Sequence, residues 1–393
     1  MILLEILISG AAWLLLLPTL VVFIEVVLAV THRSKPTDLE GERPRLAIVM
    51  PAHDEELGIE ATLRLILPQM ERFDRLLVVA DNCSDNTAAI AAAAGAEVIV
   101  RTDAAQRGKG YALDFGVRHL KANAPDIVMI IDADCQVTPG AIDRLARLCA
   151  RTSRPVQALY LMHAPCDAGT QLRIAELAWV IKNQVRPEGL RTLGLPCQLM
   201  GTGMAFPWAW ISTARLATGH IVEDLILGLD LARAGAPPLF CPEALVTSNF
   251  PSSSLGVQGQ RTRWEHGHMS VILREAPRLF FESLKNRNAG LMALAADLCV
   301  PPLALLGLQV GLLWSTSLIF YVVTKTMYPL WITSLTAALL ALSIYLSWLR
   351  FGRHIISLGN LAIAAVYPLA KIPLYLRFLV ARQLDWVRSK RDD

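Results

Sequence analysis

Residues 126–135 read DIVMIIDADC, an apolar run that ends in two aspartates separated by one alanine. The run is short and rich in isoleucine and valine, which favours a buried β-strand. Asp132 and Asp134 follow that strand directly, so both carboxylates can reach one small site. Two negative charges so close together need a cation, and carboxylate oxygens favour Mg²⁺ or Mn²⁺. We predict a divalent-metal site at these two aspartates; the alternative is that they cap a turn.

The sequence on either side of this strand alternates between strand and helix. Apolar runs at 45–50, 75–80 and 97–101 predict three more strands, with helical stretches at 87–94 and 108–122. This alternation predicts a doubly wound, largely parallel α/β sheet, in which ligands bind at the carboxyl ends of the strands. No GxGxxG or GxxxxGK[ST] motif follows a strand, so neither a dinucleotide fingerprint nor a P-loop is supported.

The composition places this α/β block in a membrane protein. Of the 393 residues, 54% are hydrophobic and 18% are charged, whereas soluble domains carry about 25% charge. A net charge of +3, with no dense basic run, gives no indication of a nucleic-acid partner. Seven scattered cysteines without a CxxC pair argue against a disulfide framework or a zinc site, and indicate a reducing compartment.

Three apolar segments predict membrane helices. Residues 6–24 are uncharged and long enough to cross a bilayer, and the basic residues that follow them place the chain after residue 30 in the cytosol. A cleaved signal peptide is the less favoured alternative, because no Lys or Arg precedes the run. Residues 298–323 and 330–349 predict a membrane hairpin, whose first turns Pro301 and Pro302 should break. Residues 355–370 favour a re-entrant or interfacial helix over a third span, because a basic tail follows.

Two further polar clusters follow predicted strands. Asp81, in ADNCSDN, could accept hydrogen bonds from a base or a ribose; the alternative is that it caps the next helix. Lys109 stands between two glycines that allow close backbone approach, so it could contact a phosphate. The alternative for Lys109 is a solvated lysine at a helix N-terminus, where the helix dipole disfavours it.

The later polar clusters suit the reacting end of a substrate. Glu223 and Asp224 open a predicted helix, where acids are common, and one of them could serve as a general base. In QRTRW (260–264), an arginine could bind phosphate and a tryptophan could stack on a sugar, or both could anchor a membrane boundary. The HxH at 266–268 is expected to lie at the surface. The glycine-rich GTGMAFPW (201–208) either borders a pocket or turns the chain.

Seven motifs of the sequence occur in the same order as in a known family. PAHDEE, ADNCSDNT, RGKGYAL, DADC, GTGMAF, VEDL and QRTRW run from about residue 45 to 270. In this they are similar to the membrane-bound family 2 glycosyltransferases, which include cellulose, chitin and hyaluronan synthases, ceramide glucosyltransferases and exopolysaccharide glycosyltransferases. The sequence departs from the usual pattern in having VED for TED and DN, at 81–82, for DD.

The resemblance implies a cytosolic GT-A domain inserted between transmembrane helices. It implies an inverting, metal-dependent hexosyltransferase that uses a nucleotide-diphosphate sugar, here expected to be a UDP-sugar. Asp224 would be the general base, and Asp134 with Asp132 would hold Mg²⁺ or Mn²⁺. The implied nucleotide-sugar-binding residues are Pro51, His53, Glu55, Asp81, Lys109, Asp132 and Arg263, and the implied acceptor-binding residues are Glu223, Gln260 and Trp264.

The predicted division of the chain follows from these segments. We expect an N-terminal transmembrane helix (1–30), a catalytic domain (44–270), an amphipathic interfacial segment (271–290), C-terminal membrane helices (291–380) and a basic cytosolic tail (381–393). RLFFES (278–283), Lys371 and Trp386 are candidates for holding an acceptor near the headgroups.

The small number of membrane helices favours the transfer of a single sugar to a lipid or lipid-linked saccharide. We expect this reaction at the cytosolic face of a bacterial inner membrane, in exopolysaccharide or glycolipid synthesis. A channel for a secreted polymer would need more helices to shield its hydroxyls from lipid. The alternatives are a processive polysaccharide synthase, a nucleotidyltransferase and a non-enzymatic membrane subunit.

Overall fold

The computed structural model describes residues 1–32, 41–251 and 254–380, which form two compact units. The α/β unit comprises described residues of 41–163 and 196–267, and the helical unit comprises 1–32, 164–195 and 268–380. The predicted basic tail, with Trp386, and the basic residues at 33 and 35 lie outside the described residues. Residues 164–195, expected within the catalytic domain, instead group with the segments predicted to cross the membrane.

The α/β unit is built on one eight-stranded sheet with the strand order β3-β2-β1-β4-β7-β6-β8-β5. Its strands are β1 (Leu46–Ala52), β2 (Arg75–Asp81), β3 (Glu97–Arg101), β4 (Ile127–Ile130), β5 (Gln136–Val137), β6 (Val156–His163), β7 (Met204–Pro207) and β8 (Leu239–Asn249). Its helices are α2 (Ile59–Ile66), α3 (Thr87–Ala93), α4 (Lys109–Leu120), α5 (Ala141–Thr152), α8 (Trp208–Ile211), α9 (Glu223–Arg233) and the first part of α10 (Ser254–Lys285).

The sheet is mixed: β6 also pairs in parallel with β8, and the departures from the predicted parallel sheet are β7 and β5, which run antiparallel to their neighbours. Strands β1 to β4 pair in parallel, as expected from strands joined by crossover helices. Strand β7 then pairs antiparallel to both β4 and β6, and β5 pairs antiparallel to β8. The strand–helix alternation that predicts parallel pairing ends at residue 131, so the sequence carried no such signal for the later strands.

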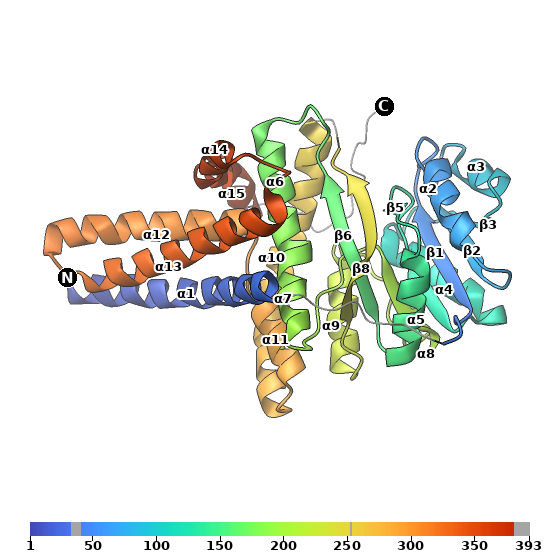
Figure 1. Ribbon diagram of the computed structural model, residues 1–393, viewed down its shortest axis with the longest axis horizontal. Coiled ribbons are helices and arrows are strands. Elements are labelled where there is room, and N and C mark those ends of the chain that lie inside the picture. The colour runs from blue at the N-terminus through green and yellow to red at the C-terminus, as the bar shows by residue number, and fades with distance from the viewer. Residues whose placement is uncertain (33–40, 252–253, 381–393) are drawn as a thin grey trace. The chain divides into compact units, whose positions relative to one another are not determined.

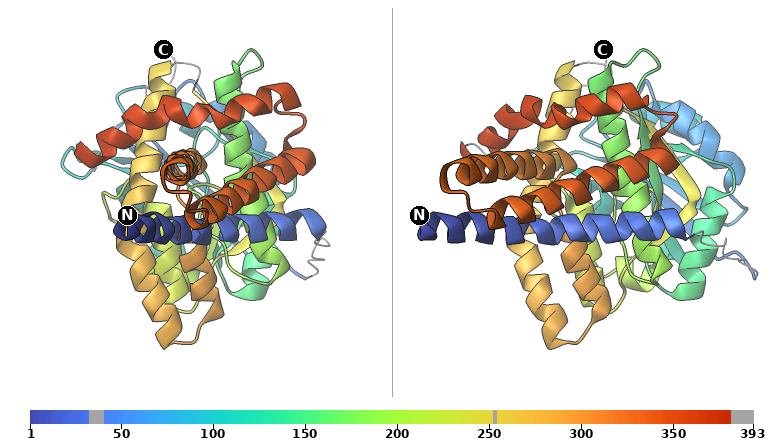
Figure 2. Two further views of the ribbon diagram at one scale, coloured as in Figure 1. Left: turned by 90° about the vertical axis from the view of Figure 1, so that its left-hand side faces the viewer. Right: turned by 60° about the vertical axis from the view of Figure 1, so that its left-hand side comes forward.

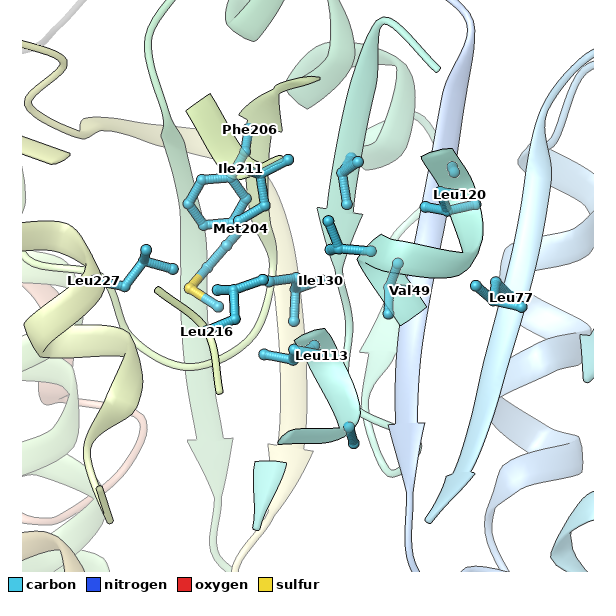
Figure 3. Packing of buried hydrophobic residues seen from close by; sticks show 14 of the residues in the cluster. Val49, Leu77, Leu113, Leu120, Ile130, Met204, Phe206, Ile211, Leu216 and Leu227 are labelled. Carbon is cyan, nitrogen blue, oxygen red and sulfur yellow. The ribbon is translucent and has the colours of Figure 1, made fainter. Parts of the chain in front are cut away.

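A buried apolar cluster on one face of the sheet joins the two halves (Figure 3). Val49, Leu77 and Ile130 come from parallel strands, while Met204 and Phe206 come from the antiparallel strand β7. Figure 3 shows the side chains of α4 and α9 reaching the same cluster. Burial of side chains of this size contributes about 1.5–3 kcal/mol each, so this cluster holds the strand ends at which the polar motifs begin.

The helical unit contains, among the described residues, three helices long and apolar enough to cross a membrane. These are α1 (Ile2–Thr31), α12 (Leu303–Thr324) and α13 (Tyr328–Ser347), the last extended by a π-helical turn to Gly352. They run side by side (Figures 1 and 2), and Ala12 and Leu16 of α1 pack against Ile332 of α13. The break that the sequence predicted at Pro301 and Pro302 lies between α11 (Ala289–Leu298) and α12.

Other helices of this unit run crosswise to the three apolar ones (Figure 1). They include α6 (Thr170–Val180), α7 (Arg186–Thr192), α11 and the second part of α10. The helices α14 (Leu358–Leu361) and α15 (Ile372–Val380) lie in two apolar stretches that bend by 50° relative to each other. That bend suits either a broken span or a re-entrant loop, so the interfacial placement stays a prediction.

Three buried charged residues join helices of this unit that are far apart in the sequence. The Nε of Arg186, on α7, donates to Oε2 of Glu25 on α1 at 2.7 Å. Its Nη2 donates to the backbone carbonyl of Asp297 on α11 at 2.8 Å and also pairs with the Asp297 carboxylate. Gly189 leaves room for this contact, because a Cβ there would lie 2.1 Å from the carbonyl oxygen of Glu25. The cluster therefore fixes α1, α7 and α11 against one another.

Candidate active site

The nucleotide-site candidates of the first two strands meet at their carboxyl ends. Pro51 lies near the end of β1, beside Val79 of β2. His53 Nδ1 lies 2.7 Å from the carbonyl oxygen of Asp81, and the backbone N–H of Glu55 donates to Thr87 Oγ1 at 2.7 Å. The structure therefore brings Pro51, His53, Glu55 and Asp81 to one edge of the sheet.

Asp81 is held by a residue that the sequence analysis did not single out. Arg101, at the end of β3, donates to Asp81 Oδ1 at 2.7 Å, and both side chains are buried. The Asn82 side chain donates to the same oxygen at 3.0 Å. The guanidinium of Arg101 also lies over the ring of Tyr111 at 5.6 Å. A strand that ends in arginine next to an aspartate-ended strand was the available signal for this pair.

Lys109 lies among the carboxylates of the other motifs. It begins α4, and its ammonium forms an ion pair with the Asp132 carboxylate and donates to the carbonyl oxygen of Gly201 at 2.8 Å. Burial lowers the pKa of Lys109, but the nearby carboxylates of Asp132, Glu223 and Asp224 outweigh burial and raise it above its usual value. The lysine is therefore a fixed positive charge at the carboxyl end of β4.

Two glycines allow Lys109 to occupy this place. Gly108 has φ +125°, a conformation that side-chain-bearing residues rarely adopt. A Cβ on Gly110 would lie 2.5 Å from the carbonyl oxygen of Leu216 and 2.7 Å from that of Thr218. The loop before α9 therefore rests directly on the first turn of α4.

Glu223 and Asp224 open α9 as predicted, and both are half-buried. A Cβ on Gly201 would lie 3.5 Å from Asp224 Oδ2 and 4.0 Å from the Lys109 ammonium. The turn at Gly201 thus brings the two motifs within reach of each other. Burial, followed by the charge of Asp224, raises the pKa of Glu223 to about 7. Glu223 is therefore partly protonated near neutral pH.

Asp132 and Asp134 offer the ligand chemistry that a divalent metal requires. The backbone N–H of Asp132 donates to Thr202 Oγ1 at 3.0 Å, which fixes the chain where it leaves β4. Asp132 Oδ1 is buried, and Asp134 is half-buried beside Cys135. Mg²⁺ is commonly held by one or two carboxylates, with its other ligands supplied by substrate phosphates and water. The two aspartates fit a metal bound in that way.

The QRTRW residues share one face of α10. Gln260, Arg263, Trp264 and Gly267 are spaced i, i+3, i+4 and i+7, which places them along one side of a helix. At Gly267 this side of α10 packs against Val222, the residue before Glu223. A Cβ on Gly267 would lie 2.7 Å from the Val222 side chain. Gln260 is buried, whereas Arg263 and Trp264 are half-buried.

The histidines next to this motif do not lie at the surface as expected. His266 is fully buried, and the half-buried His268 lies 3.4 Å from the carbonyl oxygen of Val300 in the helical unit. Burial, followed by the charges of Lys182 and Arg186, lowers the pKa of His268 to about 3. His266 lies four residues after the buried Thr262 and three before the buried Met269, a helical spacing that indicates burial.

Comparison with known proteins decides the family. A family model described as "Glycosyltransferase like family 2" matches residues 44–267, more than half of the chain. The chain belongs to glycosyltransferase family 2. The matched segment contains every site residue described above, and the α/β unit is the family's GT-A-like domain.

Curated relatives of this family 2 glycosyltransferase match it over part of their length. Glucosyl-3-phosphoglycerate synthase of Mycobacterium tuberculosis is 37% identical over 95 residues, which are 23% of this chain and 28% of the relative. The probable glycosyltransferase YdaM of Bacillus subtilis is 24% identical over 249 residues, which are 61% of this chain and 59% of the relative. The chain thus matches little more than a quarter of the mycobacterial relative.

A solved structure shares the fold over nearly the whole chain. The mannosyltransferase PcManGT from Pyrobaculum calidifontis, solved in complex with GDP-Man and Mn²⁺, matches with a TM-score of 0.54 and 16% identity. The match covers 96% of this chain and 100% of that one. It confirms the α/β architecture of this family 2 glycosyltransferase.

Proposed function

We propose that the protein is an inverting hexosyltransferase that moves a sugar from a UDP-sugar to a lipid or lipid-linked saccharide. The observation that carries this proposal is the convergence of Lys109 with Asp132 and Asp224 beside the turn at Gly201. A cation next to a proton acceptor is what glycosyl transfer from a diphosphate requires, because the leaving group gains negative charge while the acceptor loses a proton.

The nucleotide is proposed to bind at the ends of β1 and β2. Asp81 is a buried acceptor whose neighbours, Arg101 and Asn82, are hydrogen-bond donors. Both donors hold one oxygen of this carboxylate in place, and the carboxylate is proposed to accept the N–H of uracil. Pro51, His53 and Glu55 lie at the same sheet edge, where the rest of the nucleotide is proposed to bind.

Asp134 and Asp132 are proposed to hold Mg²⁺ or Mn²⁺ together with the diphosphate. The bound metal would neutralise negative charge on the leaving diphosphate. Lys109 supplies a second positive charge for the same group, and Arg263 is proposed to bind its oxygens from α10. These positive side chains are held in place before the reaction starts, and they stabilise the negative charge that develops on the leaving diphosphate. Such electrostatic stabilisation is commonly the largest contribution to lowering the barrier.

Asp224 is proposed to be the general base. It removes the proton of the acceptor hydroxyl as that oxygen bonds to the anomeric carbon. The bond from this carbon to the diphosphate breaks on the opposite face, and its electron pair leaves with the nucleotide. A single displacement of this kind inverts the anomeric centre. Glu223, Gln260 and Trp264 are proposed to orient the acceptor, Trp264 by stacking on a sugar face.

The helical unit is proposed to anchor the enzyme in a bacterial inner membrane, with the α/β unit in the cytosol. The second part of α10 lies within the predicted interfacial segment 271–290. It exposes four apolar side chains at helical spacing, those of Leu273, Phe280, Phe281 and Leu284. A helix with such an apolar stripe suits the headgroup region.

Analysis of the lipid product tests this proposal. Purified full-length protein in nanodiscs made from a bacterial lipid extract is incubated with UDP-sugars and Mn²⁺, and the lipid phase is examined by mass spectrometry. We expect one hexose added to a lipid, with inverted anomeric configuration by NMR. A ladder of hexose additions would instead identify a processive synthase. Pyrophosphate release from a nucleoside triphosphate would overturn the proposal in favour of a nucleotidyltransferase.

A further inference from the structure

A polar side chain is fully buried in the middle of the sheet, next to the loop that begins β7. Gln157 lies on β6, which is paired with β7 on one side and β8 on the other, and its side chain is shielded from solvent. Burying a carboxamide is costly unless its donor and acceptor groups are paired. Gln157 belongs to no motif of the sequence. Its hydrogen-bond partners therefore indicate what it does.

The carboxamide of Gln157 holds the backbone on both sides of Gly201. Its Oε1 accepts the backbone N–H of Met200 at 2.8 Å. Its Nε2 donates to the carbonyl oxygen of Thr202 at 2.9 Å, and also to that of Ala158, its own neighbour on β6, at 2.9 Å. The acceptor end and the donor end of one side chain thus bind the residues before and after the glycine.

The loop needs such support because two of its residues are glycines. Gly201 has φ +92° and Gly203 has φ +64°. Glycine adopts many other backbone conformations about as easily, so it does not hold these angles by itself. Hydrogen bonds from a buried and well-packed side chain restrict the loop to the observed turn.

The turn at Gly201 contacts three groups of the proposed mechanism. The carbonyl oxygen of Gly201 accepts a hydrogen bond from the Lys109 ammonium at 2.8 Å. Oγ1 of Thr202 accepts the backbone N–H of Asp132 at 3.0 Å. A Cβ on Gly201 would lie 3.5 Å from Asp224 Oδ2. A shift of this turn would therefore disturb the proposed phosphate-binding lysine and the first aspartate of the proposed metal site together.

We propose that Gln157 is a positioning residue, which fixes the turn at Gly201 so that Lys109 and Asp132 are aligned before a metal-bound nucleoside diphosphate arrives. Because its side chain is fully buried, Gln157 acts through the loop and not by contact with a substrate. Binding groups that are held in place beforehand lose less conformational entropy when the ligand binds. This inference rests on the proposed function, because it takes Lys109 and Asp132 as donor-binding residues.

Isothermal titration calorimetry on the full-length protein in neutral detergent tests this role. The probes are UDP and GDP, each with Mn²⁺, and the Tm of every variant is recorded. Gln157→Met removes both hydrogen-bonding ends with little change in size and should weaken UDP binding by about 10–100-fold. Ile127→Ala is the matched control for lost stability, because Ile127 is buried at the opposite end of β4 from Asp132. It should lower the Tm but leave UDP affinity within about twofold of wild type.

A second variant at the same position separates hydrogen bonding from packing. Burial raises the pKa of the carboxyl introduced by Gln157→Glu, so it is protonated at about pH 6 and loses its proton toward about pH 8. The protonated acid keeps one acceptor and one donor for the loop. Compared with wild type at the same pH, Gln157→Glu should therefore bind UDP more tightly at the lower pH. Gln157→Met has no titrating group and should show no such recovery.

Each contrary result has a distinct meaning. If Gln157→Met binds UDP as tightly as wild type, or if Ile127→Ala weakens UDP as much for a similar loss of Tm, the positioning role is overturned while the proposed function stands. If Gln157→Glu is as weak as Gln157→Met at the lower pH, hydrogen bonds to the loop do not align the site, and the inference is wrong. If folded wild type binds neither UDP nor GDP, the proposed function fails, and this inference fails with it.

Discussion

Lys109 and Asp132 form an ion pair between the first turn of α4 and the end of β4, with side chains only 18% and 30% exposed. The pair joins two motifs that were assigned separate roles from the sequence, one toward phosphate and one toward a metal. Because Glu223 and Asp224 also act on Lys109, this ammonium holds three carboxylates together before any substrate arrives.

Removal of the lysine charge should therefore destabilise the α/β unit. We expect Lys109→Met to lower the free energy of unfolding by about 2–3 kcal/mol, less than the roughly 3–5 kcal/mol for a fully buried pair. Lys109→Met combined with Asp132→Asn should recover part of the loss, because the carboxylate that pairs directly with the lysine is then neutral as well. Chemical denaturation followed by far-UV circular dichroism measures both. If the losses from Lys109→Met and from Asp132→Asn alone add up to the loss in the double variant, the pairing is contradicted.

Asp224 and Glu223 should differ in their effect on turnover. Asp224→Asn is expected to lower kcat by about 10²–10⁴-fold, the usual contribution of a general base, with little change in the KM for the donor. Glu223→Gln is nearly the same change one residue away and should lower kcat far less. Steady-state kinetics on both variants gives the comparison. A larger loss in Glu223→Gln than in Asp224→Asn would reverse the two assignments.

The raised pKa of Glu223 should appear as pH-dependent stability. The pKa of Glu223 in the folded protein is about 7, against 4.5 for an ordinary glutamate. Between pH 4.5 and 7, Glu223 therefore keeps a proton in the folded state that it has released in the unfolded state. The stabilising contribution is complete below about pH 4.5 and is lost as the pH rises through about 7. Thermal unfolding of wild type and Glu223→Gln should show the wild-type Tm falling relative to the variant between pH 5 and 7. Parallel curves would refute the shift.

Much of the α/β unit was predictable because its first half follows a simple pattern. The strands ending at Asp81 and Ile130 were expected close to their observed bounds, and so was the helix starting at Glu223. Their apolar runs and terminal polar residues are local signals. The antiparallel strand β7 and the grouping of residues 164–195 with the membrane helices are not local, because they depend on contacts with distant segments.

The site residues differ in the same way: some belong to local sequence motifs, and others are identified by contacts between distant segments. Motif order indicated Lys109, Asp132 and Asp224, whereas Arg101 belongs to none of the motifs. The arginine that ends β3 was the local signal, but its pairing with Asp81 depends on β2 and β3 lying side by side in the sheet.

The buried cluster of the helical unit yields a further prediction. Arg186→Met would leave Glu25 and Asp297 without their shared cation, which should cost several kcal/mol and lower the Tm of the protein in detergent. Arg186→Met combined with Glu25→Gln and Asp297→Asn should restore most of the Tm. Arg191→Met, on the same helix α7, serves as the control. Equal Tm values for Arg186→Met and Arg191→Met would contradict a structural role for the cluster.

The most direct test of the account is nucleoside-diphosphate release from a panel of nucleotide sugars, with purified full-length protein, Mn²⁺ and a bacterial lipid extract. We predict release from one UDP-sugar that requires both metal and lipid, and that is lost in Asp134→Ala and in Asp224→Asn. Folded wild type that releases no diphosphate from any donor, or release that survives both substitutions, would contradict glycosyl transfer at this site.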